Sequence, residues 1–388
     1  MRWYMGIFLI AALLLAPVAA GRSTPTFPGT RFSPSRLLGR GTFLAGADVS
    51  FFGYIQKHGG VYRYRGEPVG LLKAFKTSGC NFLRLRLWHR ATAAEIKAHG
   101  ALNTVNNLAY TVPLARQIRK LGFVFDLDMH FSDTWADPGH QFTPAAWQNL
   151  SMPALRKRLF AYCKRVITKL RKAGAMPNIV QPGNEISNGI LWPHGRVWTK
   201  HGAHFGPLCR LLRSAIRGIN AGSAGRKPLI LLHVPFMAWP QFRQFFEAMN
   251  KHHVHYDMIG MSYYPFWSGP IGQLKNTFTR AARHFHKPLI VAETAYPFTD
   301  GRRWFHNMKK LDYRFTPAGQ ARYAAALVTM LKGLPDGLGR GVLWWGGEYN
   351  ADAPEFKNSP WSYRGLFNAQ GNALPTMRVL GRAARPRN

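Results

Sequence analysis

The chain has 388 residues, of which 52 are Lys or Arg, 17 are Asp or Glu and three are Cys. This length suits one large domain or two modest ones, and three cysteines without metal-ligand spacing exclude a disulfide scaffold. We expect three buried thiols, and one bridge with one free thiol is the alternative. The basic residues are dispersed and accompany no nucleic-acid-binding motif, so the charge does not indicate a nucleic-acid partner.

The first expected element is a secretory signal peptide over residues 1–20. It has a basic residue near its start, an apolar core and small residues at its end, with Val18 and Ala20 at recognition positions for cleavage. The apolar run over 7–15 is too short to span a bilayer comfortably, and a retained anchor is the alternative. We expect an exported protein, extracellular or periplasmic, without membrane contact after cleavage. Residues 21–42 are rich in Pro, Gly, Ser and Arg, which predicts a flexible leader, with a segment that lies over the folded domain as the alternative.

An apolar, strand-like run then recurs eight times, and amphipathic segments such as 153–174 and 319–334 have apolar residues at helical spacing. The strand-like runs cover residues 45–50, 81–87, 123–130, 178–185, 228–234, 256–264, 288–296 and 341–348. Strands that alternate with helices predict a parallel sheet, and eight such units predict an α/β fold of the (β/α)8 TIM-barrel type. We expect one barrel domain over 43–380 and a basic tail over 381–388.

Two glutamates close predicted strands at the edge where a TIM barrel builds its active site. Glu185 follows the fourth strand and Glu293 the seventh, so both should point into the same mouth. Glycoside hydrolysis needs such a pair, because one acid protonates the leaving oxygen while the other attacks the sugar or activates water. Arg84 or Arg86 of the second strand would keep Glu293 ionised, and burial would hold the proton on Glu185. A buried ion pair or a loop cap is the alternative for either glutamate.

Tryptophans accompany this pair, and an open cleft of indole rings suits a polysaccharide. Trp88, Trp192 and Trp345 lie at or just beyond strand ends, so we consider them candidates for sugar contacts. For each of them, a place in the core or in the barrel wall is the alternative.

The segment 125–141 combines several acids with two histidines, which raises the question of a metal site. Its spacing matches no standard zinc motif, so we expect no metal there. We expect His130, Asp133 and Trp135 to contact substrate and neighbouring loops instead.

Five motifs occur between residues 46 and 300 in the order that a barrel requires: GADVS, NFLRLRLW, MHFSDTWADPGHQFTPAAW, QPGNEISNGILWP and AETAYPFT. Together they resemble glycoside hydrolase family 53, the arabinogalactan endo-β-1,4-galactanases. The resemblance implies cleavage of internal β-1,4 bonds in galactan, a neutral side chain of pectin, with retention of configuration. It implies that Glu185 is the acid/base and Glu293 the nucleophile. It also implies that Asn184 binds the sugar 2-hydroxyl and Tyr264 contacts the nucleophile.

Two segments depart from the family's pattern. The family often has WEP at the eighth strand, whereas this chain has WWGGEYNADAP, so Glu348 has moved along the chain and sugar contacts on that side are in doubt. Some bacterial members bind calcium in a loop after the seventh strand. The charged residues of the corresponding segment 299–315 are mainly basic, and only Asp300 and Asp312 are offered as oxygen ligands, so we expect no calcium and no cofactor.

The basic excess is not explained by the resemblance. A cationic surface would hold the protein on an acidic matrix such as pectin, whereas scarce carboxylates would limit unfolding in acid; both readings stay open. We expect a monomer whose partner is a polysaccharide. The alternatives to galactan cleavage are hydrolysis of another β-linked glycan (mannan, xylan or glucan) and a non-catalytic carbohydrate-binding barrel.

Overall fold

The computed structural model describes residues 37, 39, 41–100, 104–299, 311–350, 359 and 361–385. The predicted signal peptide, nearly all of the predicted leader and the last residues of the predicted tail lie outside this part of the chain. The described residues belong to one unit, Ser33–Asn388. None of the helices formed by the described residues combines the length and the apolar character needed to cross a membrane.

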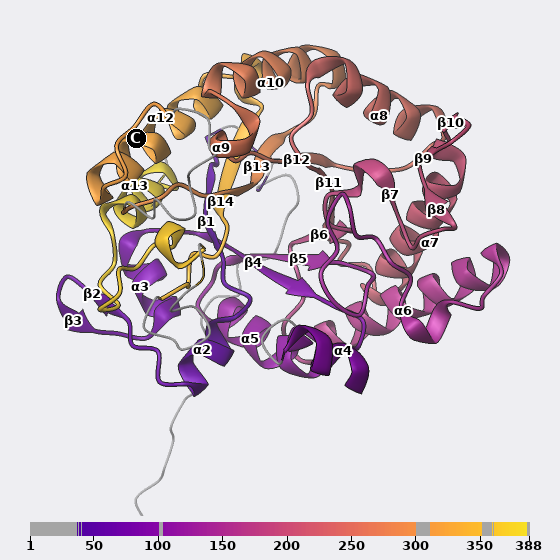
Figure 1. The fold of residues 1–388 in the computed structure, drawn as a ribbon, viewed down its shortest axis with the longest axis horizontal. Coiled ribbons are helices and arrows are strands. Elements are labelled where there is room, and N and C mark those ends of the chain that lie inside the picture. The colour runs from indigo at the N-terminus through magenta and orange to yellow at the C-terminus, as the bar shows by residue number, and fades with distance from the viewer. Residues whose placement is uncertain are drawn as a thin grey trace, which may run out of the picture. The chain divides into compact units, whose positions relative to one another are not determined.

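Eight parallel strands close into a barrel, and their order around it follows the chain (Figure 1). They are β1 (Leu44–Asp48), β4 (Phe82–Leu87), β5 (Val124–Met129), β6 (Ile179–Pro182), β11 (Leu229–Val234), β12 (Met258–Ser262), β13 (Leu289–Thr294) and β14 (Gly339–Trp344), which pairs with β1. Each strand overlaps one of the eight predicted runs, so the predicted fold is confirmed.

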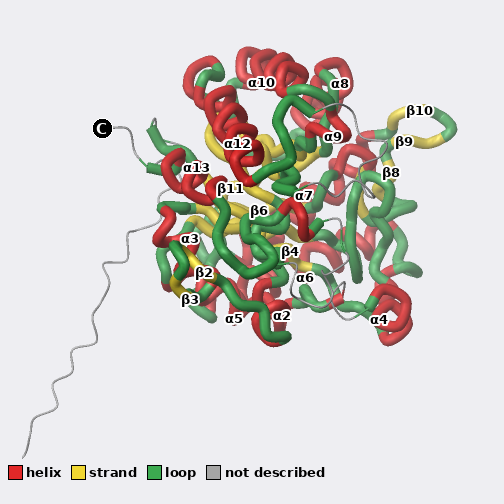
Figure 2. The backbone as a smooth tube through the Cα atoms, turned by 60° about the vertical axis from the view of Figure 1, so that its left-hand side comes forward, coloured by secondary structure: helices red, strands yellow, loops and turns green. Residues whose placement is uncertain are grey.

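Helices surround the barrel, as the tube in Figure 2 shows, and each connects one strand to the next or follows the last. They are α3 (Leu71–Ser78), α5 (Leu108–Lys120), α6 (Met152–Lys172), α7 (Phe205–Gly222), α8 (Trp239–Lys251), α10 (Ile271–Phe285), α12 (Pro317–Lys332) and α13 (Pro375–Ala383). The two predicted helices named above correspond to α6 and α12. Helix α13 crosses the predicted domain boundary at residue 380, and its Gly381 and Ala383 are buried.

Shorter helices and strands occur within the loops. They are the helices α2 (Phe52–Lys57), α4 (Ala93–His99) and α9 (Pro265–Ser268), and the strand pairs β2 (Arg63–Tyr64) with β3 (Glu67–Pro68), β7 (Gly189–Ile190) with β8 (Gly195–Arg196), and β9 (Trp198–Thr199) with β10 (Gly202–Ala203). Single 3-10 turns occur at Ala145–Trp147, Ile186–Asn188, Pro335–Gly337 and Ser362–Arg364.

Alternation along the strands separates the inside of the barrel from its outer wall. In β4, Leu83, Leu85 and Leu87 belong to the large core between strands and helices, whereas Phe82 belongs to a smaller cluster inside the barrel. Because successive side chains of a strand point to opposite faces, Arg84 shares the inner face with Phe82. The inner face is therefore apolar near the start of the strand and charged near its end.

The three cysteines, Cys80, Cys163 and Cys209, are all buried free thiols, as predicted. None of them lies at the mouth of the barrel described below.

Candidate active site

Glu293, near the end of β13, is fixed by two neighbours. The Arg84 Nη2 donates to Glu293 Oε1 at 2.6 Å, and the Tyr264 hydroxyl donates to Oε2 at 2.8 Å. The pKa of Tyr264 is raised well above its usual value by burial and by the Glu293 charge, so the phenol keeps its proton and stays a donor. Both oxygens of Glu293 are thus held in one orientation, and only 6% of the residue is exposed.

Arg84 is the centre of a buried ion network. Its Nε lies 2.7 Å from Asp48 Oδ2 of β1, and its Nη1 lies 3.6 Å from Asp128 Oδ2 of β5. Burial alone would lower the pKa of Arg84, but Glu293, Asp48 and Asp128 together raise it well above its usual value. One arginine therefore supplies positive charge to three carboxyl groups from three strands.

Arg86, the other predicted partner of Glu293, has a different role. Its Nη2 lies 3.1 Å from Asp48 Oδ1, and its Nε donates to Ser50 Oγ at 3.0 Å. Its guanidinium carbon lies 4.6 Å from the ring centre of Phe51 and 4.5 Å from that of Trp135. Arg86 thus supports aromatic rings from behind, and the structure selects Arg84 as the arginine that contacts Glu293.

An unusual backbone conformation places Glu185 at the mouth of the barrel. Gly183, just after β6, has φ +109°, and a Cβ there would lie 2.5 Å from Ile186 Cγ2. Glu185 itself adopts a left-handed conformation, with φ 49° and ψ 49°. Such a conformation is strained for a residue other than Gly, and it is typical of functional sites. The side chain of Asn184, between them, is anchored by donation from its Nδ2 to the Ala136 carbonyl at 2.7 Å.

The environment of Glu185 favours its protonated form. Burial and the Glu293 charge raise the pKa of Glu185 to about 8, while a hydrogen bond with Ser262 opposes the shift. The Ser262 Oγ lies in turn 2.9 Å from His233 Nε2. Burial lowers the pKa of His233 to about 4, so this ring is neutral at pH 7. Near neutral pH, Glu185 therefore carries a proton that it can give away.

Both glutamates face one cavity of about 780 Å³, a volume usual for ligand pockets. Its walls are largely aromatic, and the rings include Phe51, Trp135, Phe236, Tyr264, Trp267, Trp345, Tyr349 and Trp361. Neighbouring rings touch one another: the centroids of Trp345 and Trp361 are 4.2 Å apart, and those of Trp267 and Trp361 are 5.8 Å apart. Trp267 is 58% exposed, so the row of rings leads from the carboxylates to the surface.

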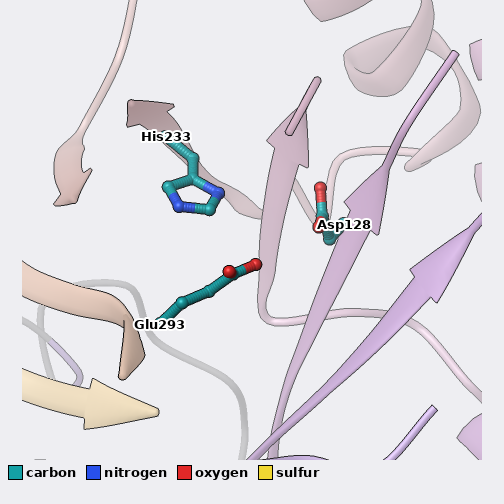
Figure 3. Close-up of side chains that lie close together, drawn as sticks. All are labelled: Asp128, His233 and Glu293. Carbon is teal, nitrogen blue, oxygen red and sulfur yellow. The ribbon is translucent and has the colours of Figure 1, made fainter. Parts of the chain in front are cut away.

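Three potential metal ligands, Asp128, His233 and Glu293, converge from β5, β11 and β13 (Figure 3). One donor atom of each lies within 4.8 Å of the others, and carboxylates with an imidazole would suit Zn²⁺. However, Arg84 contacts Glu293 and lies near Asp128, so a cationic group already occupies this position. We assign Asp128 and Glu293 to the arginine-centred ion network and His233 to its hydrogen bond with Ser262.

Comparison with known proteins agrees with this geometry. Residues 44–380 match the model of Glycosyl hydrolase family 53. The chain belongs to this family. An arabinogalactan endo-beta-1,4-galactanase of Cellvibrio japonicus is 30% identical over 356 residues, which are 86% of this chain and 89% of that protein. The chain is accordingly a glycoside hydrolase.

Solved structures of the family are similar over nearly the whole barrel. The GH53 catalytic domain of Ignisphaera aggregans superposes with a TM-score of 0.80 at 28% identity and covers 89% of this chain and 97% of that one. A fungal beta-1,4-galactanase superposes with a TM-score of 0.76 at 28% identity, over 88% and 99% of the two chains. A xylanase of Cellvibrio japonicus, at 13% identity and TM-score 0.56, shares the fold alone.

Six of the predicted site residues of this family member line the cavity. They are Glu185, Glu293, Asn184, Trp135, Tyr264 and Trp345. The contact between Tyr264 and Glu293 is the one that the family resemblance implies.

Trp88 and His130 lie behind the cavity and do not line it, contrary to the prediction. Trp88 is fully buried, and its ring centre lies 5.3 Å from that of Trp135. The Nδ1 of His130 accepts from Ala136 N at 2.9 Å, and its Nε2 lies 3.2 Å from Asp128. Both residues support side chains and loops that line the cavity, and neither is placed to touch substrate there. The same holds for Arg84 and Arg86.

Asp133 and Trp192 were predicted to bind substrate and are also displaced from the cavity. The Asp133 carboxylate accepts from Arg90 N at 3.0 Å and from Ala145 N at 2.8 Å, so it ties loops together. The Trp192 Nε1 donates to the Asn188 carbonyl at 2.8 Å, which holds the ring within its own loop. Hydrogen bonds within the scaffold therefore occupy the Asp133 carboxylate, whereas the half-buried Trp192 ring lies outside the lining of this cavity and its predicted sugar contact stays a prediction.

Glu348, whose position departs from the family's pattern, is buried. Its Oε1 accepts from Phe51 N at 2.8 Å, and burial and the Asp48 charge raise its pKa to about 8. It is therefore an internal hydrogen-bonding acid and does not line the cavity. The loop considered for calcium falls mostly outside the described residues, which resume at Leu311.

Sequence reasoning missed His233 and Ser262. A single His in the run LILLHV looks like a core residue, and Ser262 carries no signal by itself. Only the pairing of β11 with β12 places His233 beside Ser262, because the register sets His233 opposite Gly260 and Val234 opposite Met261.

Proposed function

We propose that the protein is a secreted, retaining endo-β-1,4-galactanase that cleaves internal bonds in the (arabino)galactan side chains of pectin. One observation carries the catalytic part: Glu293 is clamped by Arg84 and Tyr264, while Glu185, with a raised pKa, faces the same cavity. The substrate is suggested by relatives described as arabinogalactan endo-beta-1,4-galactanases.

In the first step, an oxygen of Glu293 attacks the anomeric carbon of the sugar. The bond from that carbon to the glycosidic oxygen breaks, and Glu185 gives its proton to the departing oxygen. The raised pKa of Glu185 suits this step, because the residue must be protonated when substrate binds. The product is a glycosyl ester on Glu293 and a free sugar hydroxyl.

In the second step, Glu185, now ionised, takes a proton from a water molecule. The water oxygen bonds to the anomeric carbon, and Glu293 leaves as a carboxylate. Arg84 supplies the counter-charge to the carboxylate that is regenerated. Two displacements at the same carbon restore the original β configuration.

The aromatic walls suit a polymeric substrate. Trp135, Trp345 and Trp361 lie one after another along the cavity, with ring centres 6.0 and 4.2 Å apart. Flat rings can pack against the apolar faces of successive sugars, and Asn184, beside Glu185, is placed to bind the 2-hydroxyl of the sugar that reacts. Secretion rests on the signal-like layout of residues 1–20.

Digestion of linear β-1,4-galactan, β-mannan and β-xylan in parallel tests the proposal. We expect galactan to give a ladder of short oligosaccharides early in the reaction, while the other two polymers persist. Brisk release of products from mannan or xylan with intact galactan would refute the substrate assignment.

Matched variants test the two glutamates. Glu185→Gln and Glu293→Gln should each lower galactan turnover by at least about a thousandfold while binding persists. Glu247→Gln, on the exposed face of α8, is the control and should keep wild-type turnover. Wild-type activity in either cavity variant would contradict the assigned roles.

A further inference from the structure

One long part of the chain is almost free of acid. Between Asp137 and Glu247 the only acidic residue is Glu185, whereas sixteen lysines and arginines occur there. Since Glu185 belongs to the catalytic cavity, this part of the chain has almost no acid on its outer surface, and among the described residues only Arg243 of its lysines and arginines forms a salt bridge, with Glu247. Helices α6 and α7 lie within it.

Helix α6 presents six exposed cations, which we name the basic stripe: Lys157, Arg158, Lys164, Arg165, Lys169 and Lys172. At 1.5 Å per residue, the stripe extends about 22 Å along the helix. The opposite face of α6 is used for packing, because Leu155, Leu159, Val166, Ile167 and Leu170 are all buried. Within the described part of the chain, no salt bridge involves the stripe.

Neighbouring helices extend this charge. Arg116 and Lys120 of α5 are exposed, and with Ala173 and Gly174 after α6 they line a shallow surface hollow. Arg217 of α7, the helix packed on the other side of α6, is exposed as well. The cations thus form a broad face centred on the stripe.

Helix stability does not account for the stripe. Arg165 and Lys169 are four residues apart and Lys169 and Lys172 three apart, so like charges meet on one face, which is locally destabilising. The helix dipole favours cations in the last turn, which covers Lys169 and Lys172 but not Lys157 and Arg158. An external anion would stabilise all six.

We propose that the basic stripe binds a linear acidic polysaccharide, a chain of uronate sugars. The choice of a polysaccharide rests on the function proposed above. A membrane fits less well, since none of the exposed large apolar side chains among the described residues lies on α6 to enter a bilayer. Nucleic acid fits less well too, because the stripe has no exposed aromatic ring for bases to stack on.

The position of the stripe allows tethering and cleavage together. Helix α6 starts from the loop after β5, at the end of the barrel that holds the cavity, and runs back towards the start of β6. Lys169 and Lys172 therefore lie towards the end of the barrel opposite the catalytic mouth. An acidic chain bound there leaves the cavity open to a neutral one.

Binding to fully de-esterified polygalacturonate measures the proposal directly, with methyl-esterified polygalacturonate as the uncharged probe. We compare the full chain with a stripe variant, Lys164→Gln/Lys169→Gln/Lys172→Gln. The control variant, Lys251→Gln/Lys275→Gln/Arg283→Gln, removes equal charge from α8 and α10, elsewhere on the ring of helices. The wild type should bind the acidic probe at low salt and release it as salt rises. The stripe variant should bind about tenfold more weakly, and the control variant within about twofold of wild type.

Three results would overturn the proposal. Equal weakening in both variants would mean that overall charge, and not the stripe, drives binding. Binding that is absent at low salt, or as strong to the esterified probe, would exclude a uronate site. Tighter binding to anionic vesicles or to single-stranded DNA than to polygalacturonate would assign the surface to another partner. Galactan hydrolysis, assayed in the same samples, reports separately on the catalytic proposal and should be unchanged in both variants.

Discussion

Replacing Ser262 by Ala should move the alkaline limb of the activity profile to higher pH. The Ser262 hydroxyl hydrogen-bonds Glu185 and lies 2.9 Å from His233 Nε2. Because His233 is neutral at pH 7, its Nε2–H can donate to Ser262, whose own proton then points to Glu185. This chain of donors stabilises the ionised form of Glu185 and lowers its pKa, so its removal raises that pKa above about 8.

The size of the effect follows from the hydrogen bond that is lost. A hydrogen bond to a charged group contributes about 1.5–3 kcal/mol when fully buried, and one pKa unit corresponds to about 1.4 kcal/mol. Glu185 is only partly buried against the cavity, so we expect a shift of about one unit. As the proposed general acid, Glu185 must be protonated in the free enzyme, so activity should fall as pH rises through its pKa. A higher pKa therefore extends activity to higher pH.

The assay is kcat/KM for a soluble galacto-oligosaccharide between pH 4 and 10. The matched control is Ser268→Ala, since Ser268 also lines the cavity but is not among the groups that shift the pKa of Glu185. An alkaline limb that stays in place, or moves to lower pH, in Ser262→Ala would refute the reasoning. The same shift in Ser268→Ala would show that any cavity serine acts in this way.

Three further changes probe the ion network and the aromatic walls. Arg84→Met leaves buried carboxylates without their cation, so the free energy of unfolding in urea should fall by about 3–5 kcal/mol; an unchanged midpoint would contradict the network. Glu348 has a pKa of about 8 in the folded protein, so the folded protein keeps this proton at pH values where the unfolded chain has lost it. The protonated Glu348 therefore contributes its full stability below about pH 4, and this contribution is lost as the pH rises towards 8. Glu348→Gln should therefore flatten the fall of unfolding free energy between pH 5 and 8 by up to about 1.4 kcal/mol per pH unit, and an identical slope in thermal or urea unfolding would argue against a buried neutral acid. Trp361→Ala should raise KM for galactan several-fold with little change in kcat, and an unchanged KM in steady-state kinetics would remove this ring from substrate binding.

Much of the fold could be predicted from the sequence because its strands are apolar runs separated by amphipathic segments. The proposed catalytic pair was also visible, since carboxylates are scarce and Glu185 and Glu293 each follow such a run. Arg84 and Arg86 could not be distinguished, because residues two apart on a strand point to the same face. Which of them reaches Glu293 depends on how β4 sits across the barrel from β13.

The errors came from polar and aromatic residues near the mouth that support the scaffold. Asp133 lies in one of the five motifs, but its carboxylate binds the backbone N–H groups of Arg90 and Ala145, which lie 43 and 12 residues away along the chain. Trp88 follows a strand end, yet its ring turns inward and packs against Trp135. Such roles depend on loop conformation, which local sequence patterns do not determine. His233 was missed because no pattern in its own strand indicates that it lies beside the cavity residues.

Trapping of the glycosyl ester tests the central claim, that Glu293 forms a covalent bond to the sugar while Glu185 handles the proton. A 2-deoxy-2-fluoro-β-galactoside with a good leaving group slows release of the ester, and peptide mass mapping then locates the label. We predict a single fluorogalactosyl group on the peptide that contains Glu293, with the attachment at that residue. A label on Glu185 or elsewhere, or an initial galactan product of inverted configuration with no label at all, would contradict the account.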